Sequence, residues 1–208
     1  MLHIEPFILL REYGTNTWLL YDDVSLEGIV VDPAAPSEVL LERIKDLGLK
    51  IKMIFNTHGH GDHIAGNAFF AEKLKAPLAI HKDDAAMLTD NHKNLSVFMG
   101  SPLPSKEADV LLEDGYTLKL GEYELKVIHT PGHTPGGICL YIDKYLISGD
   151  TLFELSIGRT DFPGGSHSGL IRSIQEKLFV LPDDVIVFPG HGPQTTIGLE
   201  KSNNPFLR

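Results

Sequence analysis

Residues 58–63 constrain this chain more than any other part of its sequence. They read His-Gly-His-Gly-Asp-His and follow an apolar run at residues 51–55, whose pattern predicts a strand. Four side chains that can bind a metal thus stand within six residues, and the intervening glycines allow a tight backbone path on which these side chains converge. Imidazole and carboxylate together suit zinc, iron or manganese better than calcium or magnesium. The fold must therefore support a metal site where this strand ends.

Three later segments share this arrangement, in which an apolar strand ends and a glycine-containing turn presents a histidine or an aspartate. They are residues 130–136 with His133, residues 148–151 with Asp150, and residues 189–193 with His191. Loops held by a rigid scaffold are the usual place for binding and catalytic residues. We therefore predict that these turns meet residues 58–63 at one edge of a sheet and complete the metal site.

The other hydrophobic patterns predict strands and helices in both halves of the chain. Strands are expected at residues 18–21, 28–32, 51–55, 78–80, 110–112, 117–120, 124–128, 138–142, 145–147 and 185–188. Helices are expected after a cap at Ser37 and at residues 64–74, 84–88 and 169–178, the last of these being the final helix. A loop containing Pro102 and Pro104 should follow the third helix. The pattern alone supports a mixed α and β class, and strands with helices in each half favour two packed sheets with helices outside.

The composition is that of a globular protein. The chain has 208 residues, of which 42% are hydrophobic, and a formal net charge of −10. This length fits one domain over residues 1–208, and the acidic balance disfavours nucleic acid as a partner. The one cysteine, Cys139, is expected to be buried on a strand and fits a reducing compartment. Without a signal-peptide pattern or a run long enough to span a bilayer, we expect a cytoplasmic protein that has no membrane partner.

The ordered motifs resemble those of the metallo-β-lactamase superfamily, and most closely those of its glyoxalase II (hydroxyacylglutathione hydrolase) branch. The resemblance rests on His-x-His-x-Asp-His, Gly-His, Gly-Asp and Gly-His, and it covers the chain from a hairpin at Asn16 to His191. It implies an α+β fold, namely an αββα sandwich of two packed mixed sheets with helices outside. It also implies that the helical C-terminal extension of glyoxalase II enzymes is lacking, because only residues 192–208 follow His191.

The resemblance further implies two divalent metal ions per chain, with zinc expected and iron or manganese as alternatives. One ion would be held by His58, His60 and His133, the second by Asp62, His63 and His191, and Asp150 would bridge them. Asp150 disfavours a true β-lactamase, whose characteristic sites lack that carboxylate. Asp62 and Asp150 would be the catalytic residues, with Asp62 orienting the nucleophile. Arg159 would bind the substrate, because it stands in the loop where the family places a basic contact to glutathione.

The activity implied is hydrolysis of an acyl-thioester of the hydroxyacylglutathione type by a metal-bridging hydroxide. A thiolate leaves almost without a general acid, which suits a site with no obvious acid beyond its ligands. The alternatives are a mononuclear-iron persulfide dioxygenase on the same fold and a lactonase or other ester hydrolase. A nuclease or a non-catalytic metal scaffold fits less well. The expected partner is thus a small thioester or ester, and the sequence leaves open its acyl group, any link to glutathione, the oligomeric state and the role of residues 82–104.

Overall fold

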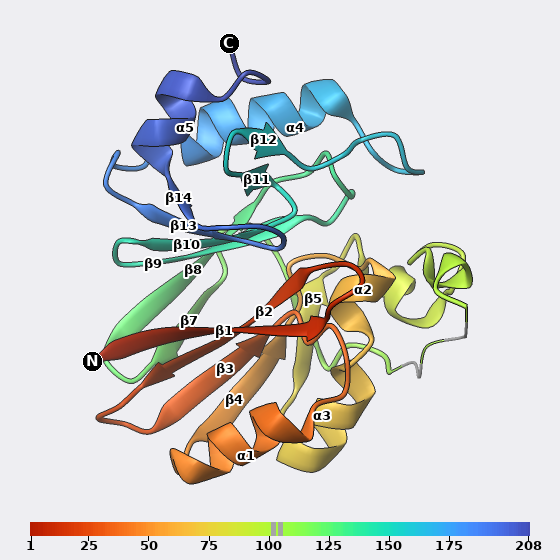
Figure 1. The fold of residues 1–208 in the computed structure, drawn as a ribbon, viewed down its shortest axis with the longest axis vertical. Helices are drawn as coiled ribbons and strands as arrows, with labels where there is room; N and C mark the ends of the chain where they lie inside the picture. Colours follow the sequence, from red (N-terminus) through yellow and green to blue (C-terminus); the bar gives the residue numbers. More distant parts are fainter. Residues whose placement is uncertain (101–102, 104–105) are drawn as a thin grey trace.

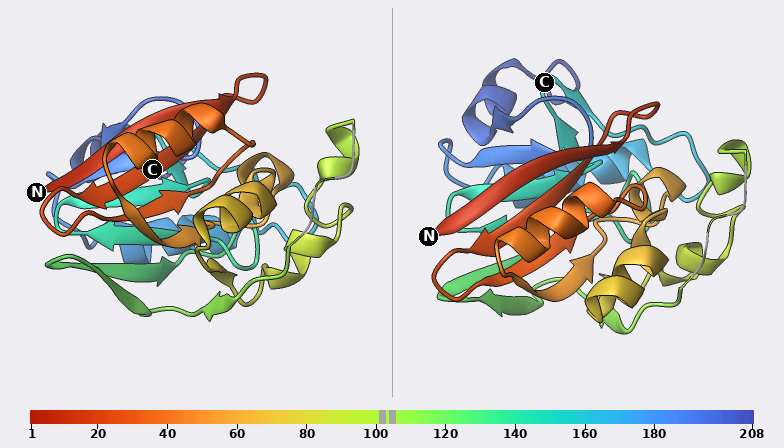
Figure 2. Two further views of the ribbon diagram at one scale, coloured as in Figure 1. Left: turned by 90° about the horizontal axis from the view of Figure 1, so that it is seen from below. Right: turned by 60° about the horizontal axis from the view of Figure 1, so that its bottom comes forward.

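Two six-stranded sheets packed face to face form the centre of the fold (Figure 1). The computed structural model describes residues 1–100, 103 and 106–208, so the predicted loop prolines Pro102 and Pro104 lie outside the described residues. The helices α1 (Glu38–Asp46) and α3 (Asn67–Leu74) cover the outer face of the first sheet, as Figure 2 also shows. The helices α4 (His167–Ser173) and α5 (Ile197–Asn203) cover the second. The αββα sandwich expected from the sequence is confirmed.

The first sheet combines an antiparallel and a parallel part. In order across the sheet its strands are β1 (Leu2–Leu10), β2 (Thr15–Asp22), β3 (Glu27–Val31), β4 (Lys50–Phe55), β5 (Leu78–His81) and β6 (Val110–Leu112). The strands from β3 to β6 are parallel, and helices connect β3 to β4 and β4 to β5. The carboxyl ends of these strands therefore lie at one edge of the sheet.

The second sheet brings further strand ends to the same edge. Its strands in order are β14 (Thr195–Thr196), β13 (Ile186–Pro189), β10 (Tyr145–Gly149), β9 (Ile138–Ile142), β8 (Tyr123–His129) and β7 (Thr117–Leu120). The pair β10 and β13 is parallel, so the turns after these two strands are neighbours. A small hairpin of β11 (Leu152–Phe153) and β12 (Ser156–Ile157) follows β10.

Strand alternation divides the hydrophobic residues between three layers. Trp18 and Leu20 of β2 point into the core between the two sheets, whereas Leu19 and Tyr21 belong to the cluster under α1 and α3. Cys139 is fully buried in the cluster under α4, on the strand where the sequence predicted it. Within the described residues, no helix is long and apolar enough to cross a membrane.

Several elements differ from the prediction. Residues Leu2–Leu10 form the strand β1, which was not predicted. This strand tolerates Pro6 because it lies at the edge of the sheet. The helix predicted at 169–178 begins earlier, after the cap Ser166, and its second half is a π-helix at Ile174–Leu178. It is also not the final helix, because Thr196 caps α5, whose Ile197 is buried.

Candidate metal centre

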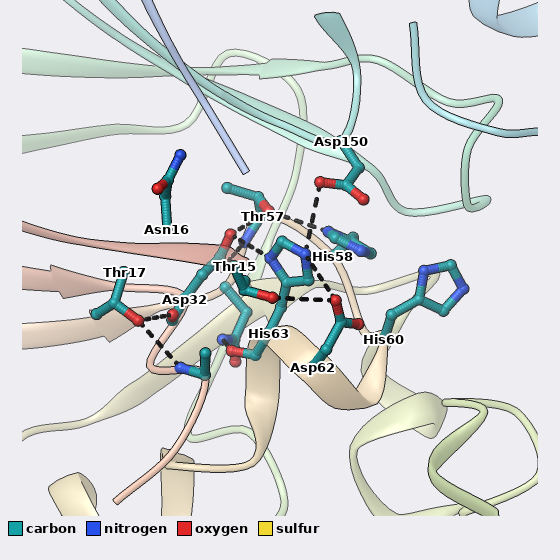
Figure 3. A network of polar contacts seen from close by, with 12 residues as sticks. Thr15, Asn16, Thr17, Asp32, Thr57, His58, His60, Asp62, His63 and Asp150 are labelled. Atoms are coloured by element: carbon teal, nitrogen blue, oxygen red, sulfur yellow. Dashed lines mark hydrogen bonds and ion pairs between the residues drawn. The ribbon is translucent and has the colours of Figure 1, made fainter. Parts of the chain in front are cut away.

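The four predicted motifs meet where β4, β8, β10 and β13 end. His58 and His60 follow β4, and the short helix α2 (Gly61–Ile64) carries Asp62 and His63. His133, Asp150 and His191 follow β8, β10 and β13 respectively. Figure 3 shows the residues after β4 grouped below Asp150, which comes from the opposite sheet.

Three histidines form a first cluster. One ring nitrogen from each of His58, His60 and His133 lies within 4.8 Å of the others, and Nδ1 of His60 is 2.9 Å from Nε2 of His133. Burial lowers the pKa of His60 to about 3 and the pKa of His58 well below its ordinary value. Both rings are therefore neutral, as metal ligands must be.

Asp62, His63 and His191 form a second cluster by the same criterion. The Nε2 atoms of His63 and His191 are 3.2 Å apart, and Oδ2 of Asp62 lies 3.4 Å from Nε2 of His191. Two imidazole nitrogens and a carboxylate oxygen thus face one point, which is a donor set typical of zinc or iron.

The Asp150 carboxylate lies between the two clusters. Its Oδ2 is 3.5 Å from Nε2 of His133 in the first cluster and 3.5 Å from Nε2 of His191 in the second. Its Oδ1 is 3.5 Å from Nε2 of His63 and, like Nε2 of His58, is buried without a hydrogen-bond partner. A buried polar atom without a partner is costly, and a cation at each cluster would satisfy both atoms. The structure brings all seven predicted ligands together, and their role as ligands stays a prediction.

The outer nitrogens of three of these histidines are held by hydrogen bonds. Nδ1 of His133 donates to the backbone oxygen of Arg159 at 2.7 Å, and Nδ1 of His191 donates to that of Tyr13 at 3.1 Å. Nδ1 of His63 lies 3.0 Å from Oδ2 of Asp32. Metal-binding histidines usually make such a bond with the nitrogen that does not face the ion. In each of these rings Nε2 is left to face the cluster, so the donor set fits bound divalent cations.

Charge within the site is balanced by histidine protons. Burial lowers the pKa of His63, but the charges of Asp150 and Asp62 outweigh burial and raise it to about 9. Burial also opposes protonation of His191, whose hydrogen bonds to Asp150 and Asp62 raise its pKa to about 11. Burial raises the pKa of Asp150, but the charge of His63 lowers it well below its ordinary value. Bound cations would replace these protons as the partners of the carboxylates.

Asp32, which the sequence reasoning missed, supports the second cluster through its contact with His63 (Figure 3). Its Oδ1 accepts a hydrogen bond from the backbone N–H of Thr57 at 2.7 Å, and its Oδ2 accepts one from the Thr57 hydroxyl at 2.6 Å. Asp32 thereby fixes both His63 and the residue before His58. The available signal was an aspartate directly after the apolar strand β3, which pairs with the strand that leads to the histidines.

Asp84, also missed, joins the loops that carry the first cluster. It accepts hydrogen bonds from the Gly59 N–H at 3.1 Å, the Thr134 hydroxyl at 2.7 Å and the Gly136 N–H at 2.6 Å. Gly59 separates His58 from His60, and Thr134 follows His133. Burial raises the pKa of Asp84, although the three bonds oppose this shift. Asp84 lies in the segment 82–104, whose role the sequence left open.

A cavity of about 640 Å³ opens onto the clusters, and Arg159 lines it. The guanidinium of Arg159 makes two hydrogen bonds, of 2.8 and 2.7 Å, to the carboxylate of Asp161. It also lies over the ring of Phe162, 3.9 Å from the centroid. The predicted substrate contact is thus at the cavity, but its charge is already paired by Asp161.

Comparison with known proteins agrees with this geometry. The model of the metallo-beta-lactamase superfamily matches residues 10–191. The hydroxyacylglutathione hydrolase GloC of Haemophilus influenzae is 38% identical over 213 residues, which cover 96% of this chain and 96% of GloC.

Solved structures show the same fold over nearly the whole chain. BLEG-1 B3 metallo-beta-lactamase is 39% identical with a TM-score of 0.92, covering 99% of each chain. TTHA1623 in a di-iron-bound form is 34% identical with a TM-score of 0.85, covering 98% of this chain and 100% of its own. ETHE1 from Myxococcus xanthus is 28% identical with a TM-score of 0.82, covering 98% and 83%.

Proposed function

This chain belongs to the metallo-beta-lactamase superfamily, and we propose that it is a dinuclear metal-dependent hydrolase that cleaves acyl-thioesters. The observation that carries the proposal is the position of Asp150 between two complete three-residue clusters. A site for a single iron ion needs only one such cluster, so the second cluster favours hydrolysis over oxygen chemistry. The similarity to GloC makes lactoylglutathione the first thioester to assay.

The residues of the two clusters would have different roles in the proposed reaction. His58, His60 and His133 would hold one cation, Asp62, His63 and His191 the other, and Asp150 would bind both. When bound, two divalent cations supply a nucleophile from water at neutral pH and polarise the substrate carbonyl. Asp62 lines the cavity, and its Oδ2 accepts a hydrogen bond from the Thr15 hydroxyl at 3.2 Å. This bond would hold the carboxylate in place to orient the nucleophile. The thiolate product departs almost without a general acid.

The test combines metal content with two substrates. We expect elemental analysis to find about two metal ions per chain, with zinc foremost and iron or manganese as the alternatives. The di-iron form of TTHA1623 supports iron among these. Lactoylglutathione should be hydrolysed equally fast under air and under argon. One iron per chain, no thioester cleavage, and oxygen uptake on addition of glutathione persulfide would show a dioxygenase instead.

Asp150 disfavours β-lactam hydrolysis, but that activity is the second candidate because BLEG-1 B3 metallo-beta-lactamase matches nearly the full length of this chain. The cavity reaches both clusters, so a cyclic amide and a thioester would meet the same groups. Nitrocefin and a simple lactone should be assayed beside lactoylglutathione on the same protein. A kcat/KM for nitrocefin above that for every thioester would reverse the order of the two candidates.

A further inference from the structure

The cavity over the metal centre has an apolar wall that the proposed chemistry does not use. Leu95, Phe98 and Met99 come from the segment around a 3₁₀ helix at Ser96–Phe98, and Phe153, Ile157 and Phe162 come from the segment after β10. Figures 1 and 2 show the first of these segments, in yellow-green, projecting from the edge of the sandwich beyond α2. A small-molecule site with many apolar and few polar groups takes its binding energy mainly from apolar contact.

The part of this wall around Leu95, Phe98 and Met99 is fixed by contacts with Gly61, which lies between two of the candidate metal ligands. The Gly61 N–H donates to the backbone oxygen of Asn94 at 2.7 Å, and a side chain at Gly61 would overlap the sulfur of Met99. Leu95 has a left-handed backbone with φ of 64°, which a leucine adopts only where its surroundings hold it. The segment therefore presents Phe98 from a defined position, and Phe98 is 78% exposed. An exposed ring among other apolar residues at a cavity marks a surface that a ligand covers.

The charges at the cavity do not match an anionic thiol carrier. Among the described residues that line it, Arg159 is the one lysine or arginine. Nε and Nη2 of Arg159 donate to the carboxylate of Asp161, and the guanidinium lies over the ring of Phe162. Glutathione carries two carboxylates, which need unpaired cations for recognition. Arg159 instead extends the apolar wall through its stacked face.

We propose that this cavity selects an uncharged thioester with an apolar acyl or thiol group, and that Phe98 and Met99 provide the selective contact. The proposal rests on the hydrolase function proposed above and narrows its substrate class. Glutathione thioesters are then cleaved only as poor substrates. The group that fills the cavity lies beside the scissile bond, because the same cavity is lined by His60, Asp62 and Asp150.

The first experiment measures kcat/KM of the metal-loaded protein on two series of neutral thioesters. One series has acetyl, butyryl and hexanoyl groups on N-acetylcysteamine, and the other has acetyl on ethanethiol and hexanethiol. Each methylene that becomes buried should raise kcat/KM about fourfold. The longest substrate of at least one series should exceed lactoylglutathione by roughly tenfold or more. Equal values along both series, or a higher value for lactoylglutathione, would overturn the proposal.

Three variants assign the effect to particular side chains. Phe98→Ala should reduce the hexanoyl-to-acetyl ratio of kcat/KM by on the order of tenfold, because the substrate loses apolar contact equivalent to the burial of about two methylenes. Phe206→Ala makes the same change at an exposed ring that does not line the cavity, and should leave the ratio unchanged. Asp161→Asn frees Arg159 to bind anions, so kcat/KM for lactoylglutathione should rise in this variant. An unchanged kcat/KM for lactoylglutathione in Asp161→Asn would show that Asp161 does not mask Arg159 in the wild type and would refute the proposal.

A binding measurement separates this proposal from the hydrolase function. The S-hexyl and S-methyl thioethers of N-acetylcysteamine cannot be hydrolysed, and calorimetric titration should show the S-hexyl compound binding at least tenfold more tightly. Tighter binding without cleavage of any thioester would reject the hydrolase function and support the apolar site. Thioester cleavage together with equal binding of the two thioethers would support the hydrolase function and reject the apolar site.

Discussion

Replacing Asp84 by alanine tests whether this buried carboxylate holds the two loops of the first cluster together. The substitution leaves the N–H groups of Gly59 and Gly136 and the Thr134 hydroxyl without their acceptor. The loop between His58 and His60 then loses its direct tie to the loop that carries His133. The ligands themselves stay unchanged, so any loss of metal affinity reports their positioning.

The magnitude follows from the bonds that are lost. A buried donor without an acceptor costs about 1–3 kcal/mol, and Asp84→Ala creates two such backbone donors while the threonine hydroxyl can rotate. Part of this loss is offset, because burial of the Asp84 carboxylate is itself unfavourable and raises its pKa. We expect the free energy of unfolding to fall by about 2–4 kcal/mol. Metal affinity of the first cluster should fall by about 10–100-fold, as for other residues that orient metal ligands.

The assay is a zinc titration against a chromophoric chelator, with urea unfolding of the metal-free protein measured in parallel. Asp46→Ala is the control, because Asp46 is an exposed aspartate at the end of α1, on the outer face of the first sheet. Asp84→Asn keeps one acceptor oxygen and should fall between the wild type and Asp84→Ala. A zinc affinity of Asp84→Ala within about twofold of that of Asp46→Ala would refute the positioning role.

Three further predictions concern the second cluster, the buried thiol and one glycine. His191→Ala should lower the metal content by one ion per chain in elemental analysis and abolish most thioester cleavage, whereas undiminished metal content would contradict a two-ion site. Burial raises the pKa of the Cys139 thiol from 9.0 to about 11, so at pH 8 iodoacetamide should label it about a hundredfold more slowly in the folded protein than in urea. Gly149→Ala should destabilise the protein by about 2–5 kcal/mol in urea unfolding, because Gly149 has a left-handed backbone and the added methyl group would overlap Thr57. Gly14→Ala should cost about 1 kcal/mol, because Gly14 has a left-handed backbone but no atom close to the added methyl group.

Much of the candidate site could be predicted because its determinants are local. The spacing of His58, His60, Asp62 and His63 follows from a single strand end and the turn after it. The support of these residues could not be predicted in the same way. Asp32 bonds to Thr57 across 25 positions, and Asp84 bonds to Gly136 across 52. No local pattern distinguishes such an aspartate from one in a solvent-exposed turn, since its partners are chosen by packing.

The sequence by itself determined the candidate metal-binding side chains, the strands that present them and the mixed α and β class, because hydrophobic period and turn residues act over a few neighbouring positions. Only the tertiary structure decided how those side chains are grouped. His63 and His191 are separated by 128 positions and meet because the two sheets stack with the ends of β4 and β13 at one edge. The same packing placed Phe98 and Met99 beside Gly61 and gave the cavity its apolar wall. Contacts between distant segments depend on the burial of the whole core, which no segment of the chain specifies alone.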